Sequence, residues 1–178
     1  MPFLGRPLIE YVLRRLVADA DEVLVTTQDP AALDFLGVRC VTDRLPGRGA
    51  LGGLYTALAE AQCAIVAVVA CDMPFASREL LMAQRKLLVE LGVDVVIPQS
   101  PDGLEPLHAV YRRETCLVAV EQALQREQRR MIAWFDAGRV APVLPEEFSR
   151  YADPHRTFLN LNTPEEFAQA EQLAQAEG

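Results

Sequence analysis

The sequence predicts a three-layer α/β domain with a mostly parallel sheet. Short β-branched segments alternate with amphipathic helical segments, which is the order found in a parallel sheet with helices on both faces. Residues 64–70 are apolar at every position, as expected for a central parallel strand that is buried on both faces. The chain has 178 residues, of which 51% are hydrophobic, so we expect a single domain over residues 1–178.

The regular elements are expected to open with a helix and not with a strand. Residues 7–17 place their apolar side chains at helical spacing. Residues 22–27 follow as a short β-branched strand. Asp29 and Pro30 then have the character of an N-cap and a first helical position, which predicts a helix that stops at Gly37.

The middle of the chain continues the alternation of strands and helices. The expected elements are a strand over 38–42, a loop over 43–49, a helix over 50–61, the apolar strand over 64–70 and a helix from Ser77 to residue 91.

The last part of the chain is expected to complete the sheet and to end in a helix. Thr163 and Glu166 have the spacing of a capping box, with Pro164 at the first helical position. The expected elements are strands over 94–98, 108–111 and 139–144, a helix over 115–125, a short extended segment over 157–161 and a final helix from residue 164.

Charge and hydropathy exclude several classes of function. The formal net charge of −8 argues against a nucleic-acid-binding protein, which usually carries a basic face. No apolar run reaches the length of a membrane span, and residues 1–6 lack the apolar region of a signal peptide. We therefore expect a cytoplasmic protein without a nucleic-acid or membrane partner.

Two carboxylates follow predicted strands, where ligands of open α/β sheets bind. Asp72 comes directly after the strand over 64–70, where it can either reach a ligand-bound Mg²⁺ or cap the turn before the next helix. Asp43 follows the strand over 38–42 and either contacts a ribose, a base or a metal, or serves as a turn residue.

Two glycines, one histidine and two asparagines are further candidates. Gly52 and Gly53 at a helix start each cost roughly 1 kcal/mol against alanine, which suggests close approach by a ligand or another backbone, or simply tight helix packing. His108 could bind a substrate phosphate, could act as acid or base, or could be a structural histidine at a strand start. Asn160 and Asn162 have no structural role in the pattern and could read a base or a pterin.

Several segments taken together resemble one family. The resemblance covers essentially the whole chain, and the combination of motifs is more specific than any one of them. They stand in the order seen in molybdenum cofactor guanylyltransferases: Gly5-Arg6-Pro7-Leu8-Ile9, Asp43 with Gly49-Ala50-Leu51-Gly52-Gly53-Leu54, Cys71-Asp72-Met73-Pro74, Glu105-Pro106-Leu107-His108-Ala109 and Asn160-Leu161-Asn162-Thr163-Pro164.

The resemblance implies a Rossmann-like nucleotidyltransferase fold and an activity. Members of the family join GMP from GTP to molybdopterin and release pyrophosphate, using Mg²⁺. GTP and molybdopterin are therefore the expected partners, together with a molybdoenzyme or a cofactor-insertion protein. The matching positions are Asp72 for catalysis and the metal, Thr26, Asp43, Gly52, Gly53 and Asp72 for the nucleotide, and His108, Asn160 and Asn162 for the pterin.

The chain departs from the family at its start. The family opens with a strand and a signature of the type Leu-Ala-Gly-Gly-x-Ser-x-Arg-Met-Gly followed by Asp-Lys, which cradles the triphosphate, and nothing here matches it. Lys86 is the only lysine and does not stand at the matching position. We expect this strand and loop to be absent, and the opening residues favour a start inside a longer reading frame. Two alternatives to guanylyl transfer stay open, namely a cytidylyltransferase for the same cofactor and a non-catalytic nucleotide- or pterin-binding module.

Overall fold

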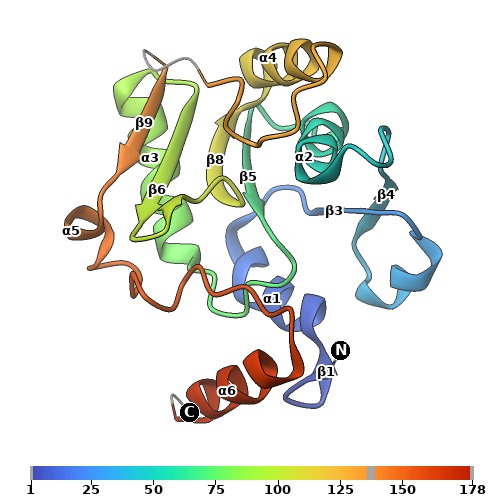
Figure 1. Ribbon diagram of the computed structural model, residues 1–178, viewed down its shortest axis with the longest axis vertical. Coiled ribbons are helices and arrows are strands. Elements are labelled where there is room, and N and C mark those ends of the chain that lie inside the picture. The colour runs from blue at the N-terminus through green and yellow to red at the C-terminus, as the bar shows by residue number, and fades with distance from the viewer. Residues whose placement is uncertain (1, 136–138, 177–178) are drawn as a thin grey trace.

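The structure is a computed structural model that describes residues 2–135 and 139–176 (Figure 1). Its helices are α1 (Leu8–Leu16), α2 (Gly49–Glu60), α3 (Arg78–Leu91), α4 (Arg113–Gln125), α5 (Pro145–Phe148) and α6 (Pro164–Gln175), with 3₁₀ turns at Val17–Asp19 and Ala31–Leu36. Its strands are β1 (Pro2–Phe3), β2 (Arg6–Pro7), β3 (Leu24–Thr27), β4 (Arg39–Thr42), β5 (Ile65–Val69), β6 (Val95–Ser100), β7 (Gly103–Leu104), β8 (His108–Arg112) and β9 (Val140–Val143).

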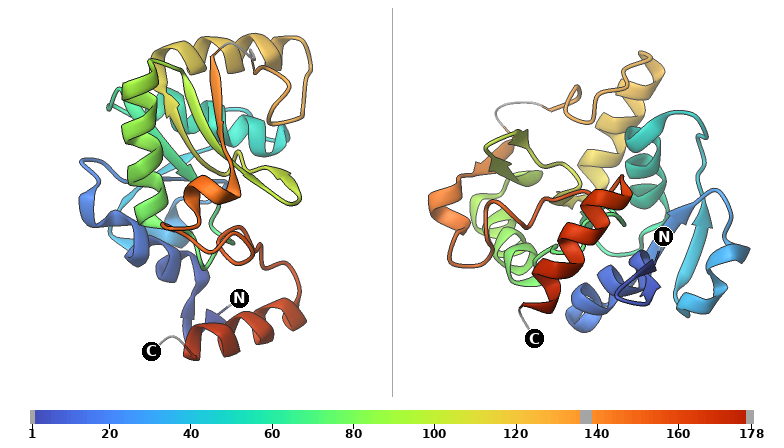
Figure 2. Two further views of the ribbon diagram at one scale, coloured as in Figure 1. Left: turned by 90° about the vertical axis from the view of Figure 1, so that its left-hand side faces the viewer. Right: turned by 60° about the horizontal axis from the view of Figure 1, so that its bottom comes forward.

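The main sheet lies between two layers of helices, which confirms the predicted α/β class. Its strand order is β5–β8–β6, with β7 and β9 also paired to β6. Helices α2 and α4 pack together on one face, and α3 covers the other (Figures 1 and 2). Leu54, Ile97 and Tyr111 belong to the buried core of the first face, and Leu80, Leu88 and Val110 to that of the second.

The pairing within the sheet is mixed and not mostly parallel. β8 lies between β5 and β6 and is antiparallel to both, whereas β6 pairs β9 in parallel. The connection from β6 to β8 is made by the short β7 turn. Such a connection is too short for the helical crossover that a parallel neighbour requires, so β8 pairs antiparallel.

β5 lies at the end of the main sheet and not at its centre, contrary to the prediction. It pairs only with β8 among the described residues, while β3 and β4 form a separate parallel pair. Helix α2 packs against both β3 and β5 and so spans the two sheets. Ala67 in the middle of β5 is exposed, because one edge of the strand carries no neighbouring strand within the described part of the chain.

The ends of the chain meet in a third cluster. The sequence pattern did not reveal the β1–β2 hairpin, whose Phe3 is fully buried against Phe167 of α6. The backbone N–H of Leu4 donates to the carboxylate of Glu171 on the same helix. Figure 2 shows α6 beside the N-terminal end of the chain. The capping box of Thr163 and Glu166 is confirmed, but the segment over 157–161 forms turns and irregular backbone instead of a strand.

The remaining predicted elements are found with small shifts at their ends, except that the segment after Pro30 is a 3₁₀ and not an α-helix. No helix among the described residues is long and apolar enough to cross a membrane.

Asp94 ties the start of β6 to its neighbours, and its loss is expected to destabilise the fold. Its side chain is 7% exposed, accepts a hydrogen bond of 2.6 Å from the Thr115 hydroxyl and pairs with Arg139. Asp94→Ala should lower the free energy of unfolding in urea by about 2 kcal/mol, the value of a hydrogen bond to a charged group. The exposed Asp34→Ala is the control and should change it by less than about 0.5 kcal/mol. Equal losses in the two variants would contradict this role.

Candidate active site

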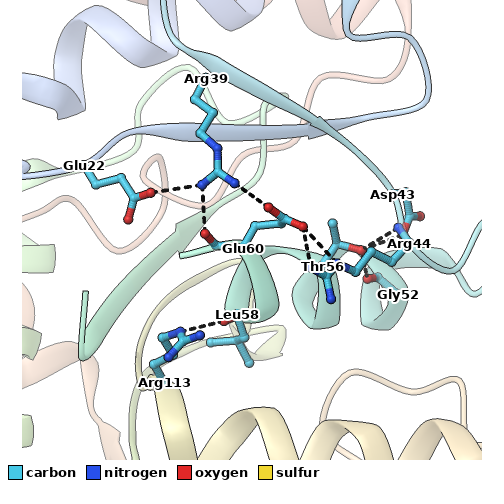
Figure 3. Close-up of polar contacts among 9 residues, drawn as sticks. All are labelled: Glu22, Arg39, Asp43, Arg44, Gly52, Thr56, Leu58, Glu60 and Arg113. Atoms are coloured by element: carbon cyan, nitrogen blue, oxygen red, sulfur yellow. Dashed lines mark hydrogen bonds and ion pairs between the residues drawn. The ribbon is translucent and has the colours of Figure 1, made fainter. Parts of the chain in front are cut away.

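Asp43 closes the loop that joins β4 to α2 (Figure 3). One carboxylate oxygen, Oδ1, accepts hydrogen bonds from the Thr56 hydroxyl at 2.8 Å and from the backbone N–H of Leu45 at 3.1 Å. The other oxygen, Oδ2, accepts from the Gln28 amide at 3.3 Å. Half of the Asp43 carboxylate therefore organises the loop, while the other half faces the exposed side with Gln28.

Three charged side chains hold β4 against α2. The Glu60 carboxylate accepts hydrogen bonds from Arg44 Nε at 2.9 Å and Nη2 at 2.6 Å, and it also pairs with Arg39. The hydrogen bonds from Arg44 lower the pKa of Glu60 below its ordinary value. Figure 3 shows that Arg39 on β4 bridges Glu22, which precedes β3, and Glu60 at the end of α2. Both guanidinium groups are thus engaged by carboxylates that fix the two-stranded sheet to the rest of the molecule.

Gly52 and Gly53 have different reasons to lack a side chain. A Cβ atom on Gly52 would lie 3.0 Å from the carbonyl oxygen of Leu45 and 2.9 Å from Cβ of Arg48. The close approach at Gly52 is therefore to the protein's own loop. A Cβ atom on Gly53 would meet only the Thr26 hydroxyl, at 3.8 Å. Gly53 thus places the open backbone of α2 beside the end of β3.

Asp72 follows β5 and carries a buried oxygen without a partner. No hydrogen bond reaches its Oδ1 atom within the described residues. A buried carboxylate oxygen without a donor is unfavourable unless a cation or ligand completes it. Groups of three or more His, Cys, Asp or Glu side chains that could hold a metal are absent from the described residues. Asp72 therefore suits a cation such as Mg²⁺, which needs only one or two carboxylates when phosphate oxygens supply other ligands.

Asn160 and Asn162 lie on the segment that passes beside Asp72. Between them, the buried Leu161 donates its backbone N–H to the Asp72 carbonyl oxygen at 3.0 Å. Both asparagines are exposed. Asn160 donates to the Phe158 carbonyl oxygen, whereas the side-chain amide of Asn162 makes no hydrogen bond to the described residues. The segment therefore presents amide groups next to the Asp72 loop.

His108 lies inside the protein and not on this surface. Its side chain is fully buried, opposite Val69 in the sheet and edge-on to Phe158. Its Nε2 atom accepts the backbone N–H of Ser77 at 3.0 Å. Burial lowers the pKa of His108 to about 4, so the ring is neutral at pH 7. The structure gives His108 the structural role of supporting the start of α3, and it does not join the exposed asparagines.

The predicted residues thus gather in two groups. Thr26, Asp43 and Gly53 stand at the ends of β3 and β4 and at the start of α2, on the side that we call the β3–β4 side. Asp72 stands with Asn160 and Asn162 at the end of β5, on the side that we call the β5 side. The pattern did not single out Thr56 or Gln28, because neither residue type has a spacing signal.

Comparison with known proteins relates the chain to nucleotidyltransferases. Residues 1–140 match the model of the MobA-like NTP transferase domain. The chain is 37% identical over 140 residues to a probable molybdenum cofactor guanylyltransferase of Pelotomaculum thermopropionicum, covering 79% of this chain and 67% of the relative. It is 34% identical to a protein of the same description in Methanothermobacter thermautotrophicus, covering 90% of this chain and 84% of the relative.

Solved structures agree in fold. The crystal structure of molybdopterin-guanine dinucleotide biosynthesis protein A from Archaeoglobus fulgidus superposes with a TM-score of 0.83 at 25% identity, over 99% of this chain and 89% of that one. A 2-C-methyl-D-erythritol 4-phosphate cytidylyltransferase from Thermus thermophilus superposes with a TM-score of 0.68 at 21% identity, over 98% of this chain and 92% of that one. The likeness to the cytidylyltransferase concerns the fold alone.

Proposed function

The chain belongs to the family of MobA-like NTP transferase domains, which are nucleotidyltransferases, and from this premise we propose that it transfers GMP from GTP to molybdopterin. The observation that carries the proposal is the buried, unpartnered oxygen of Asp72 next to the Asn160–Asn162 segment. In this reaction a phosphate oxygen of the pterin attacks the α-phosphorus of GTP. The bond to the β-phosphate breaks, and pyrophosphate leaves.

Each of the two groups of residues would bind a different substrate. We assign Thr26, Asp43 and Gly53 to the nucleotide, with Gly52 and Thr56 supporting the loop. Asp43 keeps one oxygen directed to the exposed side, and Gly53 leaves backbone accessible beside Thr26. Such a site works mainly by positioning two anionic substrates in line for transfer.

The β5 side would receive the acceptor and the metal. Asp72 would hold Mg²⁺ together with phosphate oxygens, and the bound ion would neutralise the charge that develops on the phosphates. Asn160 and Asn162 would donate amide hydrogen bonds to the pterin or to its phosphate. His108 is left out of this set because it is buried.

Nucleotide preference tests the proposal against its nearest alternative. GTP should bind more tightly than CTP in titrations with Mg²⁺, and pyrophosphate should be released when molybdopterin is added to GTP. Tighter binding of CTP would favour cytidylyl transfer. Binding of GTP and pterin without any pyrophosphate release would instead favour a non-catalytic binding module.

Adjacent residues should separate binding from stability. Asn162→Ala removes a side chain that bonds to no described residue, so it should weaken pterin binding and leave the melting temperature unchanged. Thr163→Ala removes the hydroxyl that accepts the Glu166 N–H, which should cost about 1 kcal/mol of stability and leave pterin binding unchanged. Fluorescence titration and thermal melting measure the two effects. Equal melting losses with unchanged pterin affinity would contradict the division.

A further inference from the structure

A small pocket lies beside the Asn160–Asn162 segment, and none of the residues assigned above lines it. It has a volume of about 130 Å³ and lies between the end of β6 with the turn after it and the segment over 154–159. Ser100 at the end of β6 and Asp102 on the turn line one side, and His155, Phe158 and Leu159 line the other. Ligand pockets usually measure about 300–1,000 Å³, so this one suits the end of a ligand and not a whole nucleotide.

The walls of the pocket are held in place by their own contacts. The Ser100 hydroxyl donates to the Glu105 carboxylate at 2.6 Å and accepts the backbone N–H of Asp102 at 3.1 Å. Phe158 is 8% exposed and packs edge-on against Phe148. A fixed aromatic ring and a fixed turn therefore frame the pocket before any ligand arrives.

Asp102 supplies a charged group to this frame. It is exposed, and its carboxylate makes no hydrogen bond to the described residues, since only its backbone N–H is engaged. A free carboxylate can accept two parallel hydrogen bonds from neighbouring N–H groups. The pyrimidine ring of a pterin offers such a pair, namely its amino group and the adjacent ring N–H.

The pocket is connected to the Asp72 loop by a very short stretch of chain. Leu159 lines the pocket, and Leu161 donates its N–H to Asp72. Two residues span at most about 7 Å, so the pocket lies close to the Asp72 loop, with Asn160 between them.

We propose that this pocket binds the pyrimidine end of the pterin acceptor, with Asp102 accepting the amino and ring N–H groups. Phe158 contributes an apolar wall for the bicyclic pterin ring. The phosphate end of the acceptor extends past Asn160 towards Asp72. The inference rests on the proposed function and adds Asp102 as a residue that determines acceptor specificity. Guanine carries the same pair of N–H groups, so the test must separate pterin from nucleotide.

The test measures 6-hydroxymethylpterin and GTP separately. Asp102→Asn keeps the shape of the side chain and removes its charge. The Kd for 6-hydroxymethylpterin, followed by its fluorescence, should rise at least about tenfold, as expected for the loss of a charged hydrogen-bond partner. The Kd for GTP and the melting temperature should not change. Glu146→Gln, an exposed carboxylate on α5, is the matched control and should alter neither Kd.

The other outcomes overturn the inference in distinguishable ways. If the Kd for the pterin is unchanged in Asp102→Asn but higher in Asn162→Ala, the pocket is not part of the acceptor site. The proposed function is not contradicted by that result. If Asp102→Asn raises the Kd for GTP and leaves the Kd for the pterin unchanged, guanine occupies the pocket. Saturable binding of GTP without any binding of the pterin to the unaltered protein would refute the pocket and the acceptor half of the proposed function together.

Discussion

An Asp72→Asn variant is expected to bind GTP with the same affinity in Mg²⁺ and in EDTA, and to lose nucleotidyl transfer by about 10³-fold. The change removes the anionic charge from a side chain whose Oδ1 atom is buried without a partner among the described residues. A bound metal ion contributes several kcal/mol to the stabilisation of a transferring phosphate, and each 1.4 kcal/mol corresponds to about a tenfold change in rate.

Two measurements separate this role from a structural one. Titration of GTP with and without Mg²⁺ reports the metal, and thermal melting reports the fold. Asparagine fits the same space, and the Asp72 carbonyl that accepts from Leu161 belongs to the backbone, so the melting temperature should be preserved. The control Glu146→Gln should retain the full dependence on Mg²⁺. If GTP binding by Asp72→Asn still depends on Mg²⁺, Asp72 is not a ligand of the metal.

The helix caps predicted from short sequence motifs are confirmed by the structure. The cap of α6 depends on Thr163 and Glu166 alone, and both hydrogen bonds of the predicted capping box are present. Ser77 likewise accepts the N–H of Leu80 at the start of α3. Such motifs involve residues within one helical turn, so a single sequence is enough to specify them.

Strand neighbours could not be predicted in the same way. The apolar run over 64–70 indicated a strand, but the sequence pattern of one strand does not contain the identity of its partners. Its partner, β8, lies more than 30 residues further along the chain. The sequence thus predicted the element and misplaced it in the sheet.

The candidate site shows the same limit. Asp43 and Asp72 were predicted to lie on loops after strands, where ligands bind in this class of fold. Both residues lie on such loops in the structure. His108 starts a strand too, but its burial comes from Phe158 and the loop before α3, which are distant in sequence. Gly52 is required by the loop directly before it, because a Cβ atom there would crowd Cβ of Arg48 and the carbonyl oxygen of Leu45.

The open edge of β5 has a specific set of unpaired backbone groups. Ala64 accepts from Arg113, and Ala70 donates to Leu107, so the even-numbered residues of β5 bond to β8. The odd-numbered residues therefore direct their N–H and C=O groups away from β8. Among the described residues no other strand pairs with that edge, and β3 likewise pairs only with β4.

An exposed, apolar strand edge recruits another strand, so this chain is expected to self-associate as its concentration rises. Sedimentation velocity should show a mass that increases with concentration. Ala67→Lys places a charge at the exposed centre of β5, where lysine needs no burial and leaves the β8 hydrogen bonds intact, so this variant should stay monomeric. Val118→Lys changes another exposed apolar residue, which lies on α4 and is 54% accessible, and this variant should associate like the unaltered chain. If Val118→Lys disperses the assemblies and Ala67→Lys does not, association runs through the helical face and the β5 edge is closed in solution.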